Sequence, residues 1–176
     1  MSQLSSISNS WGFTLIEMLV TMGVMVVVLG GGIVGFIRFN ERQTVLEASK
    51  QIQTLVRSAR VKAQVKDTPE GCSDLGGLQG FRVSGTSGAG STINVSAWCG
   101  ANKASAQPLP TASSSYTLPS TISLDTDLTL TFYTLHGGTD LASEVDVAVS
   151  GSNLTYHFLI TPGGELQEGC WGADPC

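Results

Sequence analysis

Residues 18–37, a run of twenty residues without a charge, constrain this chain more than any other feature of its sequence. An α-helix rises about 1.5 Å per residue, so the run would span about 30 Å, the thickness of a bilayer's hydrocarbon core. The run is too long for the apolar region of a secretory signal peptide, and no A-x-A cleavage site follows it. We therefore expect a membrane-spanning helix that stays with the protein.

The charges are divided along the chain, whose formal net charge is −5. Residues 38–66 carry seven basic and two acidic residues, whereas residues 67–176 carry eleven acidic and two basic ones. The acidic part disfavours binding of nucleic acid through its general surface, since phosphates need clustered Lys and Arg, although a basic patch on residues 38–66 stays open as such a site. Two interpretations remain: a solvated helix face beside an acidic domain, or a helix of one copy lying against the acidic domain of another.

The basic segment predicts a continuation of the helix. Nothing breaks the helical pattern before Asp67-Thr68-Pro69-Glu70-Gly71, a strong stop signal, so we expect a helix of about 50 residues. Its first half is apolar all round and its second half is amphipathic. Apolar residues recur every three or four positions along one stripe: Val45, Ala48, Ile52, Leu55, Ala59 and Ala63.

After Gly71 the apolar residues alternate with period two, which predicts strands. The expected strands are residues 80–83, 93–96, 127–135, 144–149 and 154–160, with a hairpin turn at 150–153. No helix separates them, so the sheet should be mostly antiparallel, with one hydrophobic face covered by the helix stripe. Residues 84–92 and 100–115 are rich in small residues and are expected to be exposed loops. The predicted fold class is α+β.

Glu17 is a single carboxylate at the start of the apolar segment. Burying it in a membrane unpaired would cost about 2.5–3.5 kcal/mol, and residues 1–37 contain no Lys or Arg to pair with it. If the chain were cut after Gly12, Phe13 would gain an α-ammonium group. That cation could pair with Glu17 of its own helix or of a neighbouring one.

The stretch Gly12-Phe13-Thr14-Leu15-Ile16-Glu17, followed by the apolar run, resembles the class III signal of type IV pilins and of type II secretion pseudopilins. The resemblance implies that a prepilin peptidase cuts after Gly12 and N-methylates Phe13. It implies that Glu17 pairs with the N-terminus of an adjacent subunit during assembly. It also implies the pilin lollipop fold, in which a long N-terminal helix packs on an antiparallel sheet.

The resemblance divides the chain into a leader peptide (1–12), a transmembrane and assembly helix (13–37), an amphipathic helix (38–66) and a β-rich globular head (67–176). It implies a single pass through the inner (cytoplasmic) membrane before assembly, and an extracytoplasmic or cell-surface fibre afterwards. The implied partners are other pilin subunits, the prepilin peptidase and the pilus assembly platform. The runs 57–60 (RSAR) and 158–164 (FLITPGG) further resemble GspH/FimT-like minor pilins.

Many pilins have a proline about two-thirds along the apolar helix, where this chain has Gly30, Gly31, Gly32 and Gly35. Each glycine lowers helix stability by about 1 kcal/mol relative to alanine. Clustered glycines also permit close packing between membrane helices. We therefore hypothesise a weak point that melts or bends when the subunit leaves the bilayer.

The four cysteines all follow the apolar run, in the part expected to be exported, where disulfides commonly form. Four cysteines allow three pairings, of which we favour the local one, Cys72–Cys99 with Cys170–Cys176. Reduced thiols are an alternative, and a zinc site is disfavoured because no C-x2-C pair is present. We expect no metal and no cofactor: the carboxylates at 125, 127, 140 and 144 lack EF-hand spacing and are better read as solvated.

No catalytic set is expected, and the chain is not predicted to be an enzyme. His136 and His157 lie on or beside predicted strands without a Ser or Cys partner. Trp98, Trp171 and Tyr133 are expected either in the core or facing a partner. The predicted function is structural, that of a prepilin polymerised through its N-terminal helix. Two alternatives stay open: a minor pilin acting at the fibre tip in adhesion or DNA uptake, and a membrane-anchored receptor or adhesin that never polymerises.

Overall fold

The computed structural model describes residues 12–134 and 138–172. The chain divides into two compact units, residues 1–39 and 40–176. One helix, α1 (Leu15–Gln64), is followed by a short 3-10 turn, η1 (Ser73–Leu75), and then by strands. The predicted helix of about 50 residues is confirmed, since α1 has 50 residues.

Helix α1 has well-formed ends. Thr14 caps its start, because the Thr14 Oγ1 accepts a hydrogen bond from the Glu17 N–H at 3.3 Å. At its end the Asp67 N–H bonds the Lys62 carbonyl at 3.0 Å, around Lys66 in the left-handed region at φ 54°. This is a Schellman arrangement with lysine in the place that glycine usually takes, and Pro69 follows it.

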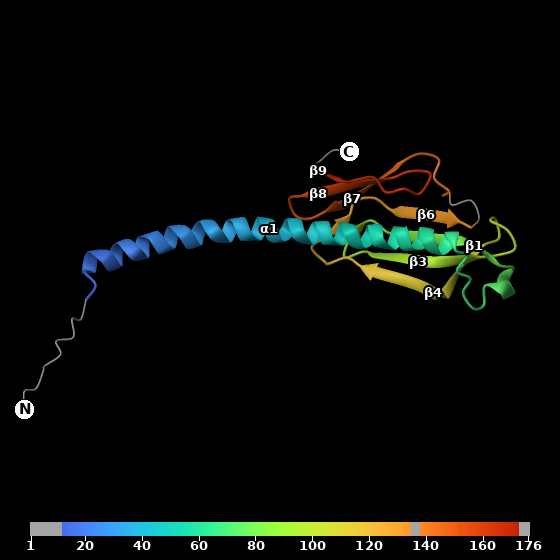
Figure 1. Cartoon of the computed structure of the whole chain (residues 1–176), viewed down its shortest axis with the longest axis horizontal. Coiled ribbons are helices and arrows are strands. Elements are labelled where there is room, and N and C mark those ends of the chain that lie inside the picture. Colours follow the sequence, from blue (N-terminus) through green and yellow to red (C-terminus); the bar gives the residue numbers. More distant parts are fainter. Residues whose placement is uncertain (1–11, 135–137, 173–176) are drawn as a thin grey trace, which may run out of the picture. The chain divides into compact units, whose positions relative to one another are not determined.

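The stripe on the second half of α1 packs against the strands (Figure 1). Val45, Ala48, Ile52, Ala59 and Ala63 are all buried, as predicted. The prediction was incomplete on one turn. There Val56 is buried and Leu55 is half-buried, although each lies three or four residues from both Ile52 and Ala59, so spacing alone does not decide which of the two faces the core.

The strands form two sheets rather than the single sheet expected. The first sheet has the order β4-β3-β1-β6 and the second the order β2-β5-β7-β8-β9. Every strand pair between these elements is antiparallel, which confirms the predicted orientation. The strands are β1 (Leu78–Gly85), β2 (Gly88–Ala89), β3 (Thr92–Cys99), β4 (Gln107–Thr117), β5 (Ser123–Leu124), β6 (Leu128–Tyr133), β7 (Val145–Ser150), β8 (Thr155–Ile160) and β9 (Cys170–Trp171).

Each of the five predicted strand segments corresponds to an observed strand, and the residue alternation sets the core. Leu128, Leu130 and Phe132 of β6 are buried, and so are Val147, Val149, Phe158 and Ile160 of β7 and β8. Strands β7 and β8 pair through the predicted hairpin, whose turn is closed by the Gly151 N–H bonding the Leu154 carbonyl at 2.8 Å.

The two predicted loops are wrong in part. Residues 107–115 belong to β4, which pairs with β3 at the edge of the first sheet. Residues 84–92 contain β2 and the ends of β1 and β3. Strand β4 lacks large alternating apolar residues and contains two prolines, which an edge strand tolerates because one of its sides needs no ladder hydrogen bonds.

Candidate functional site

The predicted processing residues lie at the start of α1. Gly12 and Phe13 precede the helix, and both are exposed, Phe13 by 72%. Glu17 occupies the third helical position, where a carboxylate is stabilised by the positive end of the helix dipole. Thr14 and Glu17 together have the T-x-x-E spacing of a capping box, of which the Thr14 half is formed. Sequence reasoning missed this capping role, which that spacing alone would have revealed.

No described residue covers the first half of α1. From residue 12 to residue 40, every side chain that the structure describes is exposed, including Leu15, Val27 and Phe36. Within the described residues Glu17 makes no ion pair. In the described part of the chain, one helix, α1, is long and apolar enough to cross a membrane. This half of the helix therefore needs lipid or other helices around it.

Residues 9–33 match the prokaryotic N-terminal methylation motif. That motif is typical of type IV pilins and pseudopilins, so the predicted class III signal is confirmed. With α1 packed on antiparallel sheets, the chain has a prepilin-like N-terminus and a pilin-like α+β fold. No curated protein and no solved structure matches the chain.

The prepilin-like head has a groove beside α1. It has a volume of about 500 Å³ and lies between the helix and residues 166–169, which precede β9. Lys50, Gln53, Thr54 and Arg57 form its helical wall, and Tyr156 and Glu168 lie opposite. Both cations are exposed, and neither belongs to an ion pair within the described residues. No local sequence pattern predicts this groove, because its walls are about a hundred residues apart in the chain.

A second hollow, of about 430 Å³, lies over one face of the first sheet. Ser84, Asn94 and Thr129 form one transverse row across β1, β3 and β6. Asp127 closes one side, and its carboxylate accepts the Ser87 N–H at 2.6 Å. That hydrogen bond lowers the pKa of Asp127, so the group keeps its charge and holds the turn before β2.

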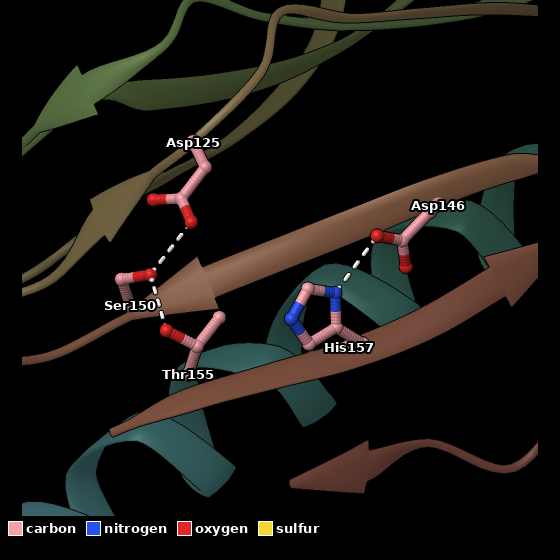
Figure 2. Close-up of polar contacts among 5 residues, drawn as sticks. All are labelled: Asp125, Asp146, Ser150, Thr155 and His157. Atoms are coloured by element: carbon pink, nitrogen blue, oxygen red, sulfur yellow. Dashed lines mark hydrogen bonds and ion pairs between the residues drawn. The ribbon is translucent and has the colours of Figure 1, made fainter. Parts of the chain in front are cut away.

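The second sheet carries a polar cluster on β7 and β8 (Figure 2). His157 Nδ1 lies 2.8 Å from Asp146 Oδ2, and the two side chains point toward one another from neighbouring strands. Ser150 Oγ donates to Asp125 Oδ2 at 2.7 Å and lies 2.9 Å from Thr155 Oγ1. His157 is on a strand as expected, and it is buried. His136 lies outside the described residues.

The aromatic residues singled out from the sequence are half-buried and each lies beside a cation. Arg82 lies 3.5 Å from the ring centroid of Trp98, and Lys103 lies 3.8 Å from that of Tyr133. Trp171 packs edge-on against Tyr156, with the two ring centroids 5.1 Å apart, and the Cζ atom of Arg42 lies 4.9 Å from the Trp171 ring centroid. Such contacts stabilise the head's surface and cover these rings.

The predicted Cys72–Cys99 disulfide is confirmed, with Cα atoms 5.4 Å apart. It joins the turn after α1 to the end of β3. Cys170 is also disulfide-bonded, while its predicted partner Cys176 lies outside the described residues. In the described part of the chain no group of His, Cys, Asp and Glu side chains is arranged to hold a metal ion. The carboxylates of Asp125, Asp127 and Asp140 accept hydrogen bonds from Ser150, Ser87 and Thr131.

Proposed function

We propose that this chain is a prepilin, the structural subunit of a type IV pilus or of a type II secretion pseudopilus. A prepilin peptidase cuts it after Gly12 and N-methylates Phe13. The subunit is stored as a single-pass protein of the inner membrane and then polymerises through residues 13–37. The β-rich head is exposed on the resulting fibre.

One observation carries this proposal: an uncovered apolar helix begins at a methylation motif that contains a carboxylate without a partner among the described residues. Glu17 cannot remain ionised in an apolar environment without a large cost. The new α-ammonium of Phe13 on an adjacent subunit supplies the missing cation. The same charge pair then sets the register between successive subunits.

The Glu17→Ala variant tests whether the chain polymerises through its N-terminal helix. We expect the variant to reach the membrane and to lose fibre assembly, measured by electron microscopy and by the amount of fibre sheared from cells. Glu144→Ala is the matched control, because it removes an exposed carboxylate from the head, away from α1. Surface binding by Glu17→Ala cells in the absence of any fibre would instead support a membrane-anchored receptor or adhesin.

Intact-mass measurement of the native protein tests the processing. We expect a mass that lacks residues 1–12 and includes one added methyl group. The same measurement counts the disulfides and so tests the proposed Cys170–Cys176 bond. A mass that retains the leader would overturn the processing step.

A finer proposal is that the subunit is a GspH/FimT-like minor pilin. The proposal is supported by the sequence resemblance of two segments, residues 57–60 and 158–164. The first lies on the part of α1 that packs against the strands, and the second covers the end of β8 and the turn after it. Stoichiometry in a purified fibre distinguishes a minor subunit, present in few copies, from a major one.

A further inference from the structure

One side of α1 is left uncovered where the helix crosses the head. Its exposed residues recur every three or four positions: Glu47, Lys50, Thr54, Arg57 and Val61. We name these five residues the basic stripe. Lys50 and Arg57 are seven residues apart, so they lie on one face about 10 Å from each other and project beside the 500 Å³ groove. Val61 adds an apolar side chain that is 55% exposed.

A complementary surface follows the end of the same helix. Asp67, Glu70 and Asp74 are exposed, and none belongs to an ion pair within the described residues. We name residues 67–75 the acidic turn. Leu75 ends it with a side chain that is 42% exposed. Each copy thus carries a surface with two cations and a surface with three carboxylates, each with an apolar residue at one end, and none of these five charges belongs to an ion pair within the described residues.

We propose that the acidic turn of one copy docks on the basic stripe of a second copy, a contact that rests on the proposed function. In parallel copies this pairing needs a shift along the helix axis of about 15–25 Å, because Asp67 lies 10 and 17 residues beyond Arg57 and Lys50. Since the two surfaces differ, the contact is heterologous, so it repeats without closing and builds an open filament.

The charges around the groove favour this occupant over a nucleic acid. Glu47 lies on the stripe and Glu168 on the opposite wall, so the surface is not uniformly basic. A continuous row of phosphates would meet both carboxylates. A short acidic turn places its few carboxylates only beside Lys50 and Arg57.

Charge reversal in the full-length chain tests the contact in cells that assemble the fibre. We expect Lys50→Glu with Arg57→Glu, and separately Asp67→Lys with Glu70→Lys, each to lower the fibre yield about fivefold or more, since exposed pairs contribute modestly and reversal adds repulsion. Combining all four substitutions should restore the yield to within about twofold. Lys103→Glu and Glu144→Lys are matched controls that change charge elsewhere on the head. Unchanged yields, or a combined variant no better than either half, would overturn the proposal.

A second measurement separates this inference from the proposed function. The full chain in detergent micelles should self-associate at low salt and less so at high salt, with the same loss and restoration across the variants. This pattern supports the contact even if no fibre is ever found. A 20-nucleotide single-stranded DNA is the competing probe. If the stripe variant loses DNA binding while self-association is unchanged, the stripe is a nucleic-acid surface and the proposal fails.

Discussion

The Asp146–His157 pair shows how a single residue of this head depends on its partner. The His157 side chain is only 6% exposed, so its ring relies on Asp146 for a hydrogen bond at Nδ1. We expect Asp146→Ala to lower the free energy of unfolding by about 1–3 kcal/mol, the cost of leaving a buried polar group without its partner. Denaturant unfolding of the full chain in detergent checks this, with exposed Glu168→Ala as the control. Equal effects of the two substitutions would show that the pair is not stabilising.

Tyr116 offers a second test at this scale. Burial raises its pKa, and the negative charge of Glu47 raises it further. The fold thus favours the neutral phenol, so stability should fall as the pH rises past about 10, the ordinary pKa of tyrosine, and Tyr116→Phe should remove that loss.

We expect Glu47→Gln to shift the Tyr116 titration to lower pH but to leave it above the ordinary value, because burial remains. Absorbance at 295 nm follows the phenolate, and the difference from Tyr116→Phe identifies the residue. A titration identical to that of the unaltered chain would exclude the contribution of Glu47.

At the scale of elements, α1 runs unbroken through the glycine cluster at residues 30–32 and 35. A Cβ built on Gly30 meets no atom within 4 Å, so alanine is sterically accepted there. We expect Gly30–Gly32→Ala to stabilise the helix by about 1 kcal/mol per residue and to make the fibre less extensible. Circular dichroism and force-extension measurements on fibres test this. Fibres with unchanged extensibility and helix content would rule out the glycines as a weak point.

The helix was predictable from the sequence because its pattern is local, whereas β4 was not because it depends on a partner strand. The stripe from Val45 to Ala63 carries its own period, so its burial follows from local spacing. Strand β4 is held by its pairing with β3, and Ser113, Ser114 and Ser115 give no apolar alternation that would reveal this. The division into two sheets likewise depends on which strands pair, which no single segment encodes.

The candidate sites of the whole molecule also divide into those encoded in one contiguous segment and those assembled from distant segments. Gly12, Phe13 and Glu17 could be proposed from the sequence because they lie in one contiguous motif. The groove and the Asp146–His157 pair could not be predicted from the sequence, since each is assembled only when separate elements meet. Arg57 and Glu168, for example, line one groove from α1 and from the segment before β9.

The Cys72–Cys99 bond acts on the stability of the entire head. It spans 27 residues of sequence and joins the turn after α1 to the first sheet. We expect Cys72→Ala with Cys99→Ala to lower the free energy of unfolding by about 3–4 kcal/mol, because the unfolded chain regains the freedom that the crosslink removes. Thermal unfolding of the full chain measures this, with exposed Ser73→Ala as the control. A change below about 1 kcal/mol would mean that the bond is dispensable.

Both cysteines of that bond have no exposed surface. A thiol reductant must reach a sulfur atom to attack it, so it can act only on molecules that have opened. The rate at which dithiothreitol reduces this disulfide in the native protein therefore reports how often the head opens. On the extracellular fibre that we propose, the same shielding would make the crosslink last as long as each head stays folded, whatever the redox state of the surrounding medium.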